Sequence, residues 1–196
     1  MSARPSTLTN LLVPTYKQNI KCLSAWFDKV DDEKILCKRL APDMFPLATQ
    51  IRFVCLQAQE AVYRLQHKEI PEELLDLSQE GRMFGEEEAT NDTFVDAKAR
   101  LSEAISFLDA LEPNALDLDN CAEREMKLEL ADGVVFYLTG EQYVRDWALP
   151  QFYFHVVTAY SILRNAGVEL GKADYVPHMF AYMRPSAPLV NVEQES

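Results

Sequence analysis

Apolar residues recur three and four positions apart along much of this chain, which is the spacing of one face of an α-helix. The pattern runs over about 7–30, 43–65, 91–111 and 139–167. We therefore predict four helices over these ranges, each with an apolar face turned toward a shared core.

Individual residues mark where some of these helices begin and end. Asp43 is a suitable N-cap for the second helix and Thr139 for the fourth, because their side-chain oxygens can accept a bond from a free backbone N–H. Gly167 suits the position just after the fourth helix, where a left-handed backbone favours glycine. Pro14 lies inside the first pattern, so it either kinks that helix or places its start near Thr15.

Two segments depart from the helical period. Residues 123–138 alternate apolar and charged positions, pass through an Ala131-Asp132-Gly133 turn and continue into an apolar run, which predicts a β-hairpin. Residues 69–92 are acidic, and we predict a loop there.

These elements predict an all-α fold, a four-helix bundle with a small β-hairpin between helices three and four. A chain of 196 residues is long enough for one domain with a sizeable core. We expect residues 1–176 to form the helical bundle domain. Residues 177–196 then form a C-terminal tail, and we expect its last ten residues to be disordered.

Composition excludes several classes of partner and site. The net charge of −12 argues against a nucleic-acid surface, which needs clustered Lys and Arg, and against an anionic membrane surface. No apolar run approaches the roughly 20 residues that span a bilayer. The four cysteines lie far apart without a Cys-x-x-Cys pair, so zinc-ribbon and thioredoxin-type motifs are unsupported. The first residues lack the apolar core and small-residue cleavage site of a signal peptide, and we expect a cytoplasmic protein with reduced thiols.

The fourth helix carries the residues that bear most on chemistry. Gln151 and His155 are four positions apart, so they share a face. Pro150 removes a backbone N–H and crowds the carbonyl of Asp146, which predicts a kink or local unwinding there. The Gln151 side chain or a water molecule can satisfy that carbonyl.

The fourth helix is also apolar on two sides. One side contains Gln151 and His155. The opposite side is formed by Leu149, Tyr153, Val156, Tyr160 and Leu163. A bundle core covers one side only, so the second must meet another element. We predict a homodimer through this helix, and the competing interpretation is that the tail covers the face.

Three strings are distinctive: Leu-Ala-Pro-Asp-Met-Phe-Pro-Leu-Ala (40–48), Leu-Pro-Gln-Phe-Tyr-Phe-His-Val-Val-Thr-Ala-Tyr-Ser-Ile-Leu-Arg (149–164) and Gly-Val-Glu-Leu-Gly-Lys-Ala-Asp-Tyr (167–175). In these three strings the chain resembles the family catalogued as domain of unknown function 1993, which is placed among the DinB/YfiT-like four-helix bundles. The resemblance covers roughly residues 8–176. It implies the bundle fold and a dimer, and it implies no particular activity.

The wider DinB-like superfamily often binds a divalent metal through three histidines, and the resemblance places those positions at Gln50, Gln151 and His155. Two of the three imidazoles are thus replaced by amides, which are weak ligands for zinc or nickel. Three interpretations stay open: a hydrogen-bonded polar cluster in the core, a site for a weakly bound divalent metal, or a small-molecule pocket.

These residues leave three functions open. The first is a dimeric DinB-like bundle with a degenerate metal site or a small-ligand pocket. The second is a metal-dependent transferase or isomerase in which His155 is a metal ligand or general base. The third is a protein–protein interaction module that uses the second apolar face of the fourth helix.

Overall fold

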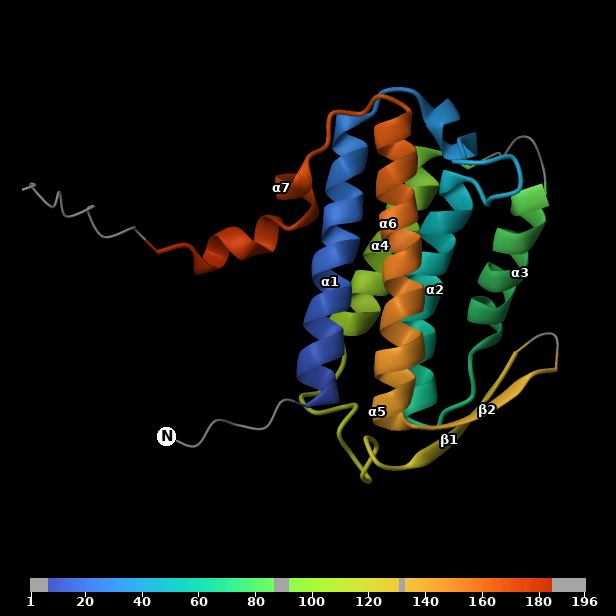
Figure 1. Ribbon diagram of the computed structural model, residues 1–196, viewed down its shortest axis with the longest axis vertical. Helices are drawn as coiled ribbons and strands as arrows, with labels where there is room; N and C mark the ends of the chain where they lie inside the picture. The colour runs from blue at the N-terminus through green and yellow to red at the C-terminus, as the bar shows by residue number, and fades with distance from the viewer. Residues whose placement is uncertain (1–6, 87–91, 131–132, 185–196) are drawn as a thin grey trace, which may run out of the picture.

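Four long helices form the body of the molecule (Figure 1). The computed structural model describes residues 7–86, 92–130 and 133–184. The bundle helices are α1 (Leu8–Trp26), α2 (Leu47–Leu65), α4 (Phe94–Asp109) and α6 (Leu149–Asn165). The structure therefore confirms the predicted four-helix bundle. Pro14 lies inside α1, so a helix start near Thr15 is wrong.

Contacts at the helix ends give the directions of the bundle helices. The backbone N–H of Leu8, at the start of α1, donates to Oδ1 of Asp117, which follows the end of α4 (2.7 Å). At the other end of α1, Nε1 of Trp26 donates to the carbonyl of Asp174, which follows the end of α6 (3.0 Å). The helix α1 therefore runs antiparallel to α4 and parallel to α6.

The core consists of apolar side chains that the four helices turn toward one another. Its fully buried members include Leu12, Tyr16, Ile51, Leu101 and Phe152. Full burial of one such side chain contributes about 1.5–3 kcal/mol, so the helical apolar period is what holds the bundle together. None of the described helices is both long and apolar enough to cross a membrane.

The start of α2 differs from the prediction. Asp43 is not its N-cap, because residues 41–44 form a separate turn in which Met44 N–H donates to the Ala41 carbonyl (3.0 Å). Pro46 occupies the cap position, and Leu47 N–H donates to the Lys38 carbonyl (2.9 Å). The connection before α2 contains two short 3-10 helices, Phe27–Lys29 and Glu33–Cys37.

The loop predicted over residues 69–92 is wrong for most of its length. Helix α3 (Glu72–Glu86) occupies this segment and lies against α2, outside the four-helix body (Figure 1). Leu74 packs with Phe53 and Leu56 of α2 in a small apolar cluster separate from the main core. Glu72 and Glu73 in the first turn are favourable there, because a helix N-terminus attracts negative charge.

The predicted hairpin and helix cap are confirmed. Strands β1 (Glu125–Glu129) and β2 (Val135–Thr139) pair antiparallel, with Glu125 opposite Thr139. Gly133 has a φ of 84°, as a tight turn requires, while Ala131 and Asp132 lie outside the described residues. Thr139 then caps α5 (Gly140–Tyr143) in a capping box with Gln142.

The predicted disturbance at Pro150 is present. A π-helical turn, Val144–Ala148, separates α5 from α6, and Pro150 lies in the first turn of α6. At its other end α6 is followed by Gly167 with a φ of 91°, as predicted. The predicted disorder of the last ten residues concerns positions outside the described part of the chain.

The second apolar face of α6 is largely covered within the chain. Val156 and Leu163 are fully buried. The ring of Tyr160 packs edge-on against Trp26 of α1 (centroids 5.4 Å apart) and against Tyr175 (5.9 Å). Tyr175 ends α7 (Lys172–Tyr175), so the segment after α6 folds back to cover this face. These contacts favour the competing interpretation, in which the segment after the fourth helix covers this face, and the homodimer stays a prediction.

Candidate functional site

A groove of about 630 Å³ lies between α2, α3, the hairpin and the start of α6. Its apolar walls include Phe53, Leu56, Leu74, Leu128 and Trp147. Its polar lining includes Gln57, Glu60, Arg64, Arg82, Gln151 and His155. Mostly apolar walls with a few polar groups are typical of a pocket for a small organic molecule.

The π-helical turn contributes to one wall of this groove. Trp147 lies within the turn, and Gln151 follows in the first turn of α6. Both residues line the groove together with His155. Such turns insert a residue into the helical register and occur often at functional sites. The interruption that Pro150 predicts in the sequence is thus part of the groove wall.

His155 is held by a buried hydrogen bond to Gln50. Nδ1 of His155 lies 2.8 Å from Oε1 of Gln50. The amide orientation is defined because Nε2 of Gln50 donates to the carbonyl of Phe45 (3.1 Å). Oε1 can only accept, so Nδ1 of His155 carries the proton and donates. Nε2 of His155 is then the nitrogen with the free lone pair.

Burial keeps the His155 imidazole neutral. Desolvation lowers the pKa of His155 from 6.5 to about 4, because the charged form loses its hydration inside the protein. Among the described residues, no carboxylate bonds to the ring to offset this loss. At neutral pH, His155 is therefore a hydrogen-bond acceptor or a base at Nε2.

Phe53 connects His155 with a cation at the groove. The rings of Phe53 and His155 have centroids 4.9 Å apart and are tilted by 40°. The guanidinium carbon of Arg82 lies 6.0 Å from the centroid of the Phe53 ring, within the range of a cation–π contact. One ligand lying over Phe53 can therefore contact both Arg82 and His155.

The other charges in the groove have partners nearby. Nε of Arg64 donates to Oε1 of Glu60 at 2.6 Å, one turn away on α2. Glu129 pairs with Lys127 at 2.6 Å on β1. Arg82 has no acidic partner within the part of the chain that the structure describes, so it is the cation that can take an anion from a ligand.

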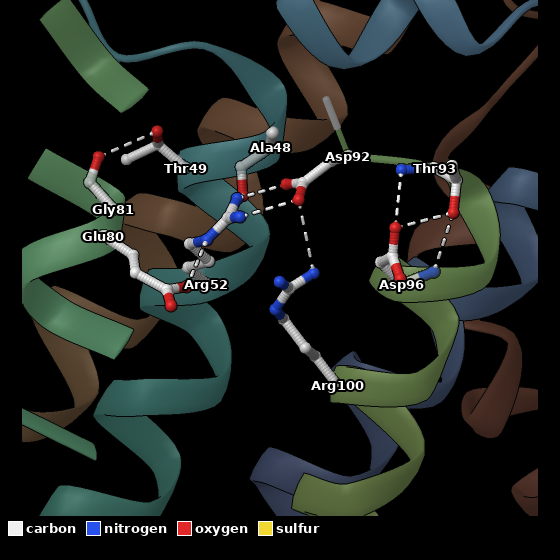
Figure 2. Close-up of polar contacts among 9 residues, drawn as sticks. All are labelled: Ala48, Thr49, Arg52, Glu80, Gly81, Asp92, Thr93, Asp96 and Arg100. Atoms are coloured by element: carbon white, nitrogen blue, oxygen red, sulfur yellow. Dashed lines mark hydrogen bonds and ion pairs between the residues drawn. The ribbon is translucent and has the colours of Figure 1, made fainter. Parts of the chain in front are cut away.

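A buried charge pair at α2 lies beside the contact between α2 and α3, the helix that carries Arg82 (Figure 2). Arg52 of α2 is 1% exposed and binds Asp92 with two nitrogens, Nη2 donating to Oδ1 at 2.7 Å and Nη1 to Oδ2. Nε of Arg52 faces Glu80 of α3 at 3.7 Å. Thr49 also donates its hydroxyl to the carbonyl of Gly81 (3.0 Å). The contacts with Glu80 and Gly81 position the α3 wall of the groove.

The comparisons with known proteins agree with this architecture. The family model described as "Domain of unknown function (DUF1993)" matches residues 8–176. The chain belongs to the DUF1993 family. A crystal structure of a DinB family member protein from Shewanella denitrificans is similar, with 29% sequence identity and a TM-score of 0.66. The similarity covers 86% of this chain and 90% of that chain, so this DUF1993 protein is DinB-like. A search of curated proteins found no match.

The structure brings two of the three predicted metal-site residues into direct contact. Gln50 and His155 form the hydrogen bond described above, and Gln50 is 2% exposed. Gln151 lines the groove with His155, whereas Gln50 does not. In this DUF1993 protein, Gln50 thus lies behind His155 and fixes its tautomer and orientation.

These donors do not fit a tight transition-metal site. One imidazole and the amide of Gln151 face the groove, while the Gln50 oxygen is engaged by the Nδ1 proton of His155. The described residues contain no group of three or more His, Cys, Asp or Glu that could hold a metal ion. Zinc and nickel favour imidazole and thiolate over amide oxygen.

Four residues that line the groove were not predicted from the sequence: Phe53, Glu60, Arg64 and Arg82. Phe53 lies on α2 and reads as an ordinary core position, and Arg82 lies in the segment taken for a loop. A signal was present for the pair: Glu60 and Arg64 are four apart, the spacing of an ion pair on one helical face.

Proposed function

We propose that the groove binds a small organic anion that has an apolar or aromatic body and a hydrogen-bond donor. In this proposal the donor bonds to Nε2 of His155, the body lies over Phe53, and the anionic group meets Arg82. The observation that carries the proposal is the hydrogen bond between His155 and Gln50, which leaves the Nε2 lone pair for a ligand.

The dimensions and chemistry of the groove support this ligand class. Its volume of about 630 Å³ suits a small organic molecule, whose pockets span about 300–1,000 Å³. A neutral imidazole accepts a hydrogen bond without repelling a donor, and burial lowers the pKa of His155 enough to keep it neutral. Arg82 supplies positive charge on a protein whose net charge is −12.

Thermal unfolding with a defined probe tests the proposal. The probe is para-hydroxyphenylacetate, which has a ring, a hydroxyl donor and a carboxylate. Phenylacetate lacks the donor, and tyramine lacks the anion. A ligand at one hundred times its Kd stabilises the folded state by about 2.7 kcal/mol, so binding raises Tm. We expect the largest rise with para-hydroxyphenylacetate.

Two variants and one control decide whether the groove is responsible. His155→Leu removes the acceptor and Arg82→Gln removes the cation, and each should reduce the rise in Tm. Arg145→Gln changes an exposed arginine outside the groove and should leave it intact. The proposal fails if no probe raises Tm, or if the rise is the same in all three variants.

A metal-dependent transferase or isomerase that uses His155 is the second candidate. The observation in its favour is the tautomer, since a histidine whose Nδ1–H is held by an oxygen is oriented to bind a metal through Nε2. Elemental analysis of untagged protein and thermal unfolding with nickel, zinc or manganese test it. Less than about a tenth of a metal per chain and no change in Tm would count against a tight site, which must stabilise the fold.

We also infer a cytoplasmic location. Cys22, Cys55 and Cys121 are buried thiols that form no disulfide among the described residues. Burial raises the pKa of the Cys55 thiol to about 12, which keeps it protonated and unreactive. Free thiols in this number are typical of a reducing compartment.

A further inference from the structure

A second groove lies between α1 and the segment that follows α6, and we call it the α1 groove. Its volume is about 520 Å³, and it shares no lining residue with the groove that contains His155. One side is formed by α1 and the other by residues 173–180, which include the start of a 3-10 helix, Pro177–Tyr182. Figure 1 shows this segment leaving the bundle beside α1.

The α1 side of the groove is a single helical stripe. Gln18, Lys21, Cys22, Ala25 and Trp26 line it, and they recur three and four positions apart, so they lie on one face of the helix. The stripe is about 12 Å long from Gln18 to Trp26 at the rise of an α-helix. A long, narrow floor of this kind suits an elongated ligand.

The opposite wall is apolar and is fixed to the bundle. Pro177 and Phe180 line it, and the Phe180 side chain is 59% exposed. At the base of this wall the ring of Tyr175 stacks on Trp26, with centroids 6.1 Å apart. Nε1 of Trp26 also donates to the carbonyl of Asp174 (3.0 Å). The wall therefore stays beside α1, and its exposed phenyl ring can cover the apolar part of a ligand.

Lys21 is the cation that the α1 groove offers to a ligand. The other lysine at the groove, Lys29, is bound by the Asp174 carboxylate (2.7 Å). Lys21 is exposed and forms no ion pair within the part of the chain that the structure describes. Asp109 lies within electrostatic reach of Lys21, but Lys17 binds its carboxylate. The groove is thus locally positive on a chain whose net charge is −12.

His178 adds a hydrogen-bond donor to the lining. Its Nδ1 is buried and has no hydrogen-bond partner among the described residues. A proton on Nδ1 would be an unsatisfied buried donor, so the neutral ring carries its proton on Nε2 instead. One ammonium and one N–H suit a head group with a single negative charge, such as a carboxylate.

We propose that the α1 groove binds a free carboxylate with an unbranched apolar chain, of the fatty-acid class. The carboxylate meets Lys21 and Nε2 of His178, and the chain lies along the α1 stripe beside Phe180. The residues Pro177, His178 and Phe180 lie beyond residue 176, where the family match ends, so the family resemblance does not supply this site. The site does not depend on the function proposed for the groove at His155.

Tryptophan fluorescence tests this site directly. The chain has two tryptophans, and Trp147→Phe leaves Trp26, at the α1 groove, as the only one. Bromine quenches tryptophan emission at short range, so the probe is ω-bromoundecanoate, used below the concentration at which it forms micelles. We expect saturable quenching. The trimethylammonium compound with the same brominated chain should bind at least about tenfold more weakly, because its charge is repelled by Lys21.

Matched variants of the Trp147→Phe chain identify the residues that bind. Lys21→Glu reverses the charge at the groove and should raise the Kd about tenfold, whereas Lys68→Glu makes the same change at an exposed lysine elsewhere and should leave the Kd nearly unchanged. Phe180→Ala removes an apolar wall and should raise the Kd about fivefold. Its control is Tyr182→Ala, in the same segment but outside the groove lining.

Far-UV circular dichroism checks that each variant is folded. The proposal is overturned if the quenching does not saturate, or if the trimethylammonium compound binds as tightly as the carboxylate. Equal Kd values for Lys21→Glu and Lys68→Glu would overturn it as well, because the head group would then not contact the groove lysine.

Discussion

The imidazole of His155 donates through Nδ1 to the side-chain oxygen of Gln50, 105 residues earlier in the chain, at 2.8 Å. This bond joins the middle of α6 to the start of α2. It fixes the ring so that Nε2 is free, and the ring lines a groove. The contact therefore belongs both to the bundle core and to the candidate site.

Removing the acceptor should destabilise the fold. Gln50→Leu leaves the buried Nδ1–H of His155 without its partner, and such a loss costs about 1–3 kcal/mol. Urea unfolding measures the change in the free energy of unfolding. Gln57→Leu, on the same helix but at the partly exposed groove wall, is the control and should change it little. Equal stabilities of the two variants would show that the bond contributes nothing.

Acid should weaken the fold through His155. Its pKa is about 4 in the folded protein and 6.5 when unfolded, so between these values the unfolded chain binds a proton that the folded chain does not. This contribution is complete above pH 6.5 and is lost as the pH falls toward 4. Each pKa unit corresponds to about 1.4 kcal/mol, so the full loss is about 3 kcal/mol.

The variant His155→Gln isolates this contribution from that of the carboxylates. The difference in the free energy of unfolding between native protein and variant should shrink as the pH falls from 6.5 to 4. A difference that stays constant over this range would mean that His155 titrates alike in the folded and unfolded chains.

Gly140 should not tolerate any side chain. A Cβ at this position would overlap the carbonyl oxygen of Cys121, so the backbone where the hairpin meets α5 would have to move. We expect Gly140→Ala to destabilise by about 1–3 kcal/mol, the usual cost of overpacking. At Gly171 the nearest such contact is 3.9 Å, so Gly171→Ala is the matched control. Similar melting temperatures for the two variants would contradict the close approach.

Breaking the ion pair between Arg52 and Asp92 should have a large effect. Asp92→Ala leaves the guanidinium of Arg52, which is 1% exposed, without its two-nitrogen contact (Figure 2). Removing one partner of a buried pair costs about 3–5 kcal/mol. The control is Asp28→Ala, which breaks an exposed pair with Lys98 and should change stability little. Calorimetric unfolding of both variants tests the contrast, and equal small losses would contradict it.

The sequence predicts the bundle and the hairpin well because their signals are local. The helical spacing of apolar residues lies within the helices that it predicts. Thr139 and Gly167 likewise lie directly at the helix ends that they mark. Helix α3 was missed because most of its residues are charged and polar, and its contact with α2 depends on a few apolar side chains such as Leu74. The prediction of Asp43 as the N-cap of the second helix failed for a different reason. Asp43 has a side chain suited to a cap, but it lies in a separate turn before the helix.

The candidate site was predicted only in part. Spacing on α6 places Gln151 and His155 on one face, and both line the groove. The direction of the Gln50 amide follows from its bond to the Phe45 carbonyl, and no spacing in the sequence encodes that bond. Arg82 joins the site only because α3 packs against Phe53, which is a tertiary contact.

The central claim is that His155 presents a free Nε2 lone pair to a ligand in the groove while Gln50 holds its Nδ1 proton. Nuclear magnetic resonance of the protein with isotope-labelled histidine reports both ring nitrogens directly. We predict that Nδ1 of His155 is protonated at neutral pH, and that para-hydroxyphenylacetate shifts the Nε2 resonance in a saturable way while Nδ1 stays protonated. A proton on Nε2 in the free protein, or an Nε2 resonance that the ligand never moves, would contradict the account.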